Sequence, residues 1–378
     1  MIECWGAAVP KPRRRLYRKA QRLGQIVLLW RRVNRLWRWP SIVAFRRALR
    51  VCRRDRFEPA EAFRLGLFHP ASAHDRPSCY VSRKRLTKVQ EALNPAGWAP
   101  LLKNKDLFYR YSAALGIPVP RLYAVVQATA PGWSCAGGAI RTPKEWTTFF
   151  ERYLPAEFAV KPAVGAYGNG FNIYRRVSGG YVDALENRIE SSVLYDALVS
   201  SGHDRYVIQE RVHSHSDLVR LSGTQALQTV RMITLVEPAG DVRILHAHLK
   251  VIEAEEIVDT FLDGLTGNIE APVDLESGCL ESANRIPDTG CGVVTIDVHP
   301  KTRIPFARFL LPFWPQACDL VRQTSPHFLP VRTIGWDVAL TPTGPLIVEG
   351  NVWWDPPNQH GNLHTVLQTI RDLCPSVT

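Results

Sequence analysis

The chain has 378 residues, of which 46% are hydrophobic and 22% are charged. This length and balance are typical of a globular protein with two or three packed units, and they exclude a chain that is disordered throughout. The formal net charge of +12 comes from one end of the chain, because residues 1–56 hold 17 Lys or Arg and two acidic residues while the remainder is nearly neutral.

The eight cysteines include no Cys-x-x-Cys pair, so we expect neither a zinc site nor a disulfide framework. We interpret them as reduced thiols of a cytosolic protein. The longest apolar run near the N-terminus, residues 26–30, is too short to cross a bilayer. We therefore predict no signal peptide and no transmembrane helix.

The basic N-terminal segment is expected to form two amphipathic helices. Between Leu16 and Trp37, apolar residues recur at steps of three or four, with arginines between them. Pro40 ends this helix, and Ser41 is suited to begin a second one that runs through Arg54. Such helices can pack their apolar stripe on the folded body, lie on an anionic membrane or bind nucleic acid. We regard nucleic acid as the least favoured of the three.

The segment that follows predicts an α+β body. Residues 82–93 and 106–115 have helical patterns, and Gly116-Ile-Pro-Val-Pro then leads into an apolar strand over residues 122–126. Strands and helices alternate from there to the end, without an internal repeat.

A glycine-rich hairpin is the most informative motif. Lys161 lies near the end of a short apolar strand, and Gly165, Gly168 and Gly170 separate it from the next strand. Glycines let backbone amides approach phosphate oxygens, and a strand lysine supplies a positive charge. The motif matches neither a P-loop nor a dinucleotide fingerprint, because no helix follows the glycines. It is either a flexible lid over phosphates or an ordinary hairpin.

A single strand and one pair of strands extend the pattern. Residues 206–212 form an apolar strand ending in polar residues, at a place suited to an adenine hinge but equally typical of an ordinary strand. Arg231 and Lys250 lie on two strands that we expect to pair antiparallel. Cations that point inward from a sheet could offset charge on a phosphoryl group in transfer, although single strand arginines are usually solvated or ion-paired.

A late hairpin carries the candidate metal ligands. Residues 334–340 and 345–351 are two strands joined by a tight turn, which places Asp337 across from Glu349, with Asn351 two residues further on the same face. Two carboxylates and an amide oxygen form a hard site suited to Mg²⁺ between phosphates. The alternative is a strand pair with solvated acids.

Taken in order, these segments resemble the ATP-grasp superfamily. Three sequence motifs are most similar to the sugar-transfer-associated ATP-grasp group, which is related to alpha-L-glutamate ligases. They are Leu-Leu-Lys-Asn-Lys105, Thr-Val-Arg231 and Glu-Gly-Asn-Val-Trp-Trp-Asp. The resemblance implies an ATP-grasp fold, in which two α+β subdomains clamp a nucleotide. We expect a helical arm over 1–60, a helical lead-in over 61–120, a glycine-loop subdomain over 121–208 and a central subdomain with the metal site over 209–378.

The resemblance also implies a role for each candidate residue. ATP phosphates would contact Lys105, Lys161 and the glycine loop, and adenine would contact Gln209, Glu210 and Val212. Mg²⁺ would bind Asp337, Glu349 and Asn351. Arg231 and Lys250 would be catalytic. Related sequences commonly have Asp-Asn where this chain has Asp259-Thr260, so substrate contacts of that turn stay open.

The expected activity is that of an ADP-forming carboxylate ligase, of the carboxylate-amine or carboxylate-thiol kind, that works through an acylphosphate. Its partners would be a small-molecule or glycan-linked carboxylate and an amine-type acceptor, in cell-envelope or exopolysaccharide modification. The alternatives are a kinase acting on a hydroxyl group and a non-enzymatic adaptor with a decayed nucleotide site. The expected location is cytoplasmic, with residues 1–56 as a candidate contact to the inner face of the membrane.

Overall fold

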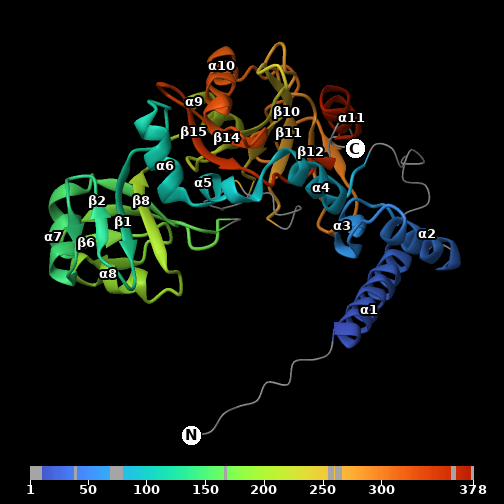
Figure 1. The fold of residues 1–378 in the computed structure, drawn as a ribbon, viewed down its shortest axis with the longest axis horizontal. Coiled ribbons are helices and arrows are strands. Elements are labelled where there is room, and N and C mark those ends of the chain that lie inside the picture. Colours follow the sequence, from blue (N-terminus) through green and yellow to red (C-terminus); the bar gives the residue numbers. More distant parts are fainter. Residues whose placement is uncertain are drawn as a thin grey trace, which may run out of the picture. The chain divides into compact units, whose positions relative to one another are not determined.

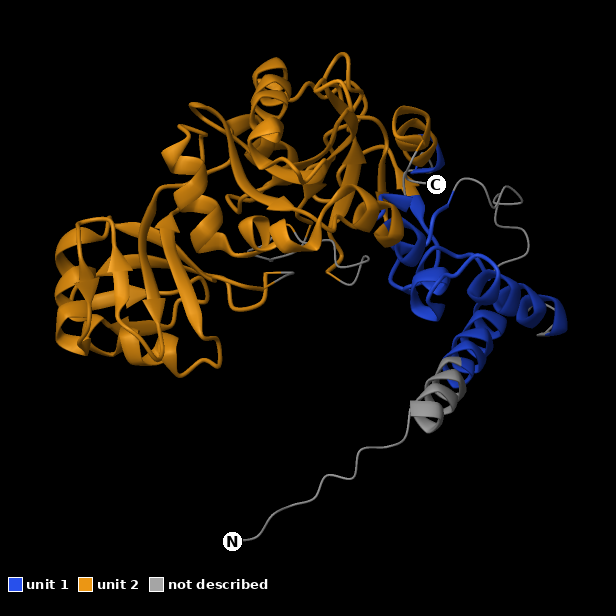
Figure 2. Cartoon of the chain, viewed as in Figure 1, with its two compact units in different colours: residues 1–86, 286–294, 356–365 blue, residues 87–285, 295–355, 366–378 orange. Residues whose placement is uncertain are grey.

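The structure is a computed structural model of the chain. It describes residues 11–37, 41–68, 80–165, 168–253, 259, 266–358 and 363–375, with the side chains of 11–22, 37 and 41 left out of account. These residues fall into two compact units (Figure 2): residues 1–86, 286–294 and 356–365 form unit 1, and residues 87–285, 295–355 and 366–378 form unit 2.

Unit 1 is built from the basic helices. The predicted pair is present as α1 (Lys11–Trp37) and α2 (Ser41–Arg53), and α3 (Pro59–Arg64) follows. Ile26 and Val33 of α1 are buried with Cys52 of α2 and with Phe63 in one hydrophobic cluster. The apolar stripe of α1 therefore has a packing partner inside its own unit. Among the residues that the structure describes, no helix is long and apolar enough to cross a membrane.

Unit 2 contains two antiparallel sheets, which short helices precede in the chain. The helices are α4 (Arg83–Leu93), whose first residues belong to unit 1, α5 (Pro100–Lys103) and α6 (Lys105–Ala114), with a 3₁₀ turn, η2, at Ala96–Trp98. Asn104 caps α6, because its side chain accepts a hydrogen bond from the Asp106 amide. In Figure 1, α5 and α6 run between the two sheets.

The first sheet has eight strands in the order β3-β2-β1-β8-β4-β5-β6-β7. Its strands are β1 (Leu122–Gln127), β2 (Gly132–Ser134), β3 (Ala139–Ile140), β4 (Glu157–Pro162), β5 (Asn172–Val177), β6 (Gly180–Val182), β7 (Arg188–Glu190) and β8 (Arg205–Glu210). Helices α7 (Pro143–Tyr153) and α8 (Ser191–Val199) cover it. Trp146 and Phe150 of α7 and Leu194 of α8 pack on Ile208 of β8.

The second sheet has seven strands in the order β13-β12-β11-β10-β9-β14-β15. Its strands are β9 (Thr229–Val236), β10 (Val242–Val251), β11 (Ile269–Pro272), β12 (Ala283–Arg285), β13 (Val294–Ile296), β14 (Thr333–Thr341) and β15 (Gly344–Asn351). The remaining helical segments are α9 (Ser216–Ser222), α10 (Trp314–Thr324), η4 (Ser325–Phe328) and α11 (Leu363–Leu373).

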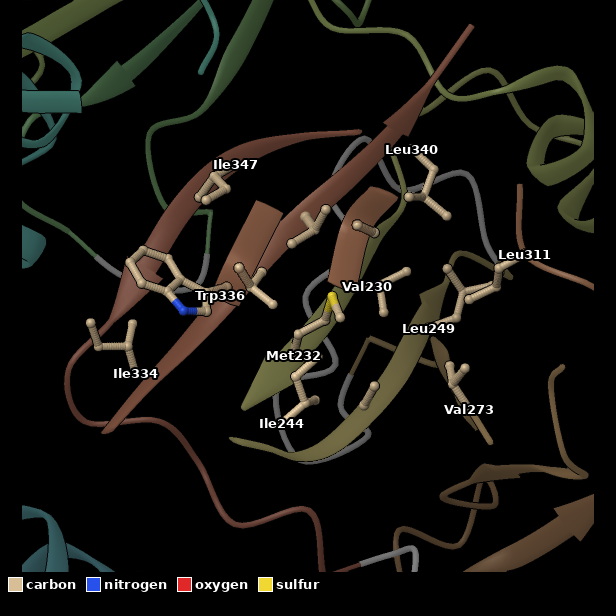
Figure 3. Close-up of a cluster of buried hydrophobic side chains, with 14 of the residues drawn as sticks. Val230, Met232, Ile244, Leu249, Val273, Leu311, Ile334, Trp336, Leu340 and Ile347 are labelled. Atoms are coloured by element: carbon tan, nitrogen blue, oxygen red, sulfur yellow. The ribbon is translucent and has the colours of Figure 1, made fainter. Parts of the chain in front are cut away.

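The core of the second sheet decides where its polar residues lie. Val230 and Met232 of β9, Leu249 of β10 and Trp336 of β14 are fully buried in one hydrophobic cluster (Figure 3). Successive side chains of a strand point to opposite faces. The neighbours of these core residues in sequence therefore project from the other face of the sheet, and three of them are charged.

Candidate active site

Three charged residues meet on that other face. Asp337 of β14 is directly opposite Arg231 of β9 in the strand register. The Arg231 Nε and Nη2 atoms donate to the two Asp337 carboxylate oxygens over 2.5 and 3.1 Å. Lys250 of β10 approaches the same carboxylate, with 3.3 Å between Nζ and Oδ2. A bidentate arginine pair of this kind is geometrically specific as well as strong.

Burial and neighbouring charges shift the pKa values of this cluster in opposite directions. Burial alone would raise the pKa of the Asp337 carboxyl, but Arg231 and Lys250 outweigh it and hold that pKa well below its usual value. Burial would likewise lower the pKa of Lys250, and the carboxylates of Asp259 and Asp337 raise it instead. All three groups are therefore ionised at neutral pH.

Asp259 is a fourth member that the sequence pattern did not identify as a site residue. Its carboxylate lies 3.2 Å from Lys250 Nζ. It also accepts hydrogen bonds from the Thr229 amide, at 2.7 Å, and from the Thr229 hydroxyl. The sequence signal for it was its place in the turn where related sequences commonly have Asp-Asn, and residues 260–265 lie outside the described part of the chain.

The late hairpin pairs as predicted. In the β14–β15 register Asp337 is opposite Glu349 and Gly335 is opposite Asn351, with a bulge after Asp337. The Asn351 amide donates to the Gly335 carbonyl at 3.2 Å and reaches the Asp337 carboxylate at 3.4 Å. The Glu349 side chain is 31% exposed, and its carboxylate lies 3.9 Å from Lys105 Nζ.

The donor set of the hairpin fits a magnesium ion that keeps several outside ligands. In the described part of the chain, no three His, Cys, Asp or Glu side chains are grouped in a way that could hold a metal ion. The hairpin offers two carboxylates and one amide, and the Asp337 carboxylate is already shared with two cations. Mg²⁺ commonly takes one or two carboxylates from a protein and completes its octahedron with water and phosphate.

Two lysines lie beside the glycine hairpin. Lys161 of β4 is 7% exposed, and its Nζ donates to the Tyr109 hydroxyl over 2.6 Å. Burial, followed by the positive charge of Lys105, lowers the pKa of Lys161 to about 7. Lys105, the first residue of α6, donates from Nζ to the Gly165 carbonyl over 3.1 Å and from its backbone amide to the Ala163 carbonyl over 2.8 Å.

The glycine hairpin itself is confirmed as two antiparallel strands, β4 and β5. Gly168 and Gly170 have φ angles of 70° and 76°, which residues with a Cβ rarely adopt. A Cβ on Gly170 would also lie 2.8 Å from Pro162 Cγ. Gly165 has ordinary space around it, so its conformation does not require glycine. Residues 166–167 lie outside the described residues.

The candidate adenine strand, β8, lies between β1 and β4. Gln209 is buried, whereas Glu210 is exposed and accepts a hydrogen bond from the Arg121 amide at 3.1 Å. Val212 follows the end of the strand and is half-buried. The structure thus places Gln209 and Glu210 on the strand next to the one that carries Lys161, where Gln209 is opposite Ala159 and Lys161 is opposite Val207.

One family model and several solved structures are similar to this chain. A family model described as sugar-transfer associated ATP-grasp matches residues 84–369. Among solved structures, a D-alanine-D-alanine ligase from Coxiella burnetii is 11% identical, with 73% of this chain and 58% of that chain covered and a TM-score of 0.38. D-alanyl-alanine synthetase A from Vibrio cholerae is 11% identical, with 72% and 65% covered and a TM-score of 0.39.

An N5-carboxyaminoimidazole synthase from Aspergillus clavatus, in complex with ADP and 5-aminoimidazole ribonucleotide, is 11% identical, with 78% and 58% covered and a TM-score of 0.38. The chain thus spans less than two thirds of the length of each of these structures. No curated protein matches the chain. Because the family match covers most of its residues in one unbroken stretch, the chain belongs to the sugar-transfer associated ATP-grasp family.

Proposed function

We propose that the protein is an ATP- and Mg²⁺-dependent, ADP-forming ligase that joins a carboxylate to an amine-type acceptor through an acylphosphate. The observation that carries the proposal is the buried cluster of Arg231, Lys250 and Asp337, which adjoins Glu349 and, through it, Lys105. A polyphosphate chain needs several cations, and a metal needs oxygen ligands close to them. Both kinds of group lie together here.

The nucleotide would be held by the first sheet and α6. Lys105 and Lys161 would contact its phosphates, with Gly165, Gly168 and Gly170 bringing backbone amides over them. The strand that ends at Gln209 and Glu210, and the Val212 backbone beyond it, would contact adenine. Lys105 Nζ donates to the Gly165 carbonyl, and nucleotide binding would replace that hydrogen bond with one to phosphate.

The metal would bind at the late hairpin. Glu349 is the most accessible ligand, and Asp337 and Asn351 complete the set once phosphate competes for Arg231 and Lys250. When bound, Mg²⁺ would neutralise charge on the phosphates. The contribution of the chain would be to keep the Asp337 carboxylate ionised, which its low pKa supports.

In the reaction, a carboxylate oxygen of the substrate would attack the γ-phosphorus of ATP, and the bond to the β–γ bridging oxygen would break to release ADP. The acceptor nitrogen would then attack the acyl carbon, expel phosphate and lose a proton. Arg231 and Lys250 would stabilise the negative charge that builds up in both steps, because they are fixed cations in a buried site.

The substrate and the location follow from the family and from unit 1. A family associated with sugar transfer favours a carboxylate that is small or glycan-linked, in cell-envelope or exopolysaccharide modification. Unit 1 presents Leu28 and Ile42, each 65% exposed, and Val43, 50% exposed, alongside the exposed Arg46 and Arg50. Aliphatic side chains among arginines suit the surface of an anionic membrane. We place the protein at the cytoplasmic face.

ADP release across a panel of acids and amines tests the activity, with hydroxylamine to trap an acylphosphate. Arg231→Ala should lower turnover about 10²-fold or more while changing ATP affinity little. Arg243→Ala is the matched control, since Arg243 lies on β10 but is paired with Glu237 at the surface and should keep full activity. ADP formation without a hydroxamate would indicate a kinase. A protein that neither binds MgATP nor releases ADP would overturn the proposal.

A further inference from the structure

Tyr109 connects the two sheets of unit 2 at the candidate phosphate site. It lies on α6, one helical turn after Lys105, and is 1% exposed. Its hydroxyl accepts a hydrogen bond from Lys161 Nζ of β4 over 2.6 Å and donates one to the Val348 carbonyl of β15 over 2.7 Å. One hydroxyl group therefore joins the lysine strand to the hairpin that carries Glu349.

The direction of this chain of hydrogen bonds is fixed by its chemistry. A carbonyl can only accept, so the single hydroxyl proton of Tyr109 must point to Val348, and the oxygen lone pairs are left to accept from Lys161. Burial, followed by the charge of Glu349, raises the pKa of Tyr109 well above its ordinary value. The hydroxyl therefore keeps its proton at neutral pH.

Lys161 has little else to hold it. Among the described residues it forms no ion pair, and the Tyr109 hydroxyl is the one hydrogen-bond acceptor that it contacts. The Tyr109 ring also lies under the ammonium, with 5.0 Å between Nζ and the ring centroid. Of the three N–H bonds of the ammonium, two remain for a ligand.

We propose that Tyr109 is a positioning residue, whose hydroxyl fixes the Lys161 ammonium relative to the strand that carries Glu349, so that the lysine meets a polyphosphate already oriented. The proposal rests on the nucleotide site described above and adds the residue that preorganises it. Fixing a flexible lysine before binding reduces the conformational entropy lost on binding. The benefit should therefore appear only with ligands that contact Lys161.

The test compares Tyr109→Phe with Tyr111→Phe by calorimetric titration of ATP, ADP and adenosine in the presence of Mg²⁺. Tyr111 is the matched control, because it lies on the same helix and its hydroxyl donates to the His327 carbonyl over 2.6 Å, away from the lysines. We expect Tyr109→Phe to weaken ATP and ADP binding about tenfold, since a hydrogen bond to a charged group is lost. Adenosine, which lacks phosphate, should bind as before, and Tyr111→Phe should change nothing.

A double-mutant cycle with Lys161→Met separates positioning from a general loss of structure. Once the ammonium is absent, the additional change Tyr109→Phe should alter ATP affinity less than twofold. An equal loss in both backgrounds, an equal loss for adenosine, or full ATP affinity in Tyr109→Phe would each refute the role of Tyr109. A wild-type protein that binds no ATP would instead refute the nucleotide site itself.

Discussion

The ion pair between Arg231 and Asp337 allows a stability change to be worked out from the structure. Arg231→Met removes two charge-assisted hydrogen bonds, of 2.5 and 3.1 Å, from a carboxylate that is only 3% exposed. Removing one partner of a buried pair typically costs about 3–5 kcal/mol. Asp337 keeps Lys250 at 3.3 Å and the Asn351 amide at 3.4 Å. We therefore expect the low end of that range, about 3 kcal/mol.

The second variant tests the cause of this loss. In Arg231→Met with Asp337→Leu no buried charge is left alone, because Lys250 still has Asp259 at 3.2 Å. Replacing a buried ion pair by apolar groups of similar volume is often neutral or stabilising. The double variant should therefore recover most of the lost stability while staying inactive.

Hydrogen exchange of the β14 amides measures the free energy of opening of this sheet directly. We expect it to fall by about 3 kcal/mol in Arg231→Met and to recover to within about 1 kcal/mol of wild type in the double variant. The folded-state pKa of Asp337 is depressed, so the contribution of the pair is present above its unfolded pKa, about 3.9, and is lost as the pH falls below it. The reasoning would be refuted by equal exchange in the single and double variants. It would also be refuted if the difference in opening free energy between wild type and Arg231→Met increased at acid pH.

Two further predictions concern proton linkage and the membrane. The pKa of Lys161 is lowered to about 7, so most Lys161 side chains are deprotonated at pH 8 before nucleotide binds. The negative charge of a polyphosphate should raise this pKa, so binding at pH 8 should take up protons. Titrations in buffers of different ionisation enthalpy should detect this proton uptake, and it should be absent in Lys161→Met. Serine at Leu28, Ile42 and Val43 together should weaken cosedimentation with phosphatidylglycerol vesicles about tenfold or more, whereas serine at Val193, exposed on α8, should not. Tight binding to duplex DNA with no response to vesicle charge would contradict the membrane assignment.

Much of the fold follows from the sequence because the signals are local. The three-to-four spacing from Leu16 to Trp37 predicts a helix, and the structure confirms it as part of α1. The two apolar strands around a tight turn predict the late hairpin, and the pairing of Asp337 with Glu349 confirms the register. Each inference depends on residues that are neighbours in sequence or on a period of 2 or 3.6 residues.

Which face of a strand a charged residue occupies, and what it meets there, depends on residues that are distant in sequence. From the sequence, Asp337 is interpreted as a metal ligand and Arg231 as a cation for phosphate, but only the register between β9 and β14 shows that the two are paired with each other. The sequence places Asp259 in a turn without indicating its partner, and its contact with Lys250 is a property of the assembled sheet.

Tyr109 shows the same division. In sequence it is one of several aromatic residues on a short helix, where packing in the core is its ordinary role. Its hydroxyl has a partner on each of two sheets only because folding brings together three segments whose order along the chain does not fix their contacts. The sequence by itself determined the family, the helices and the late hairpin, since those depend on local pattern. The tertiary structure decided the pairing of the buried charges, because a buried polar group must find its partners wherever the fold provides them.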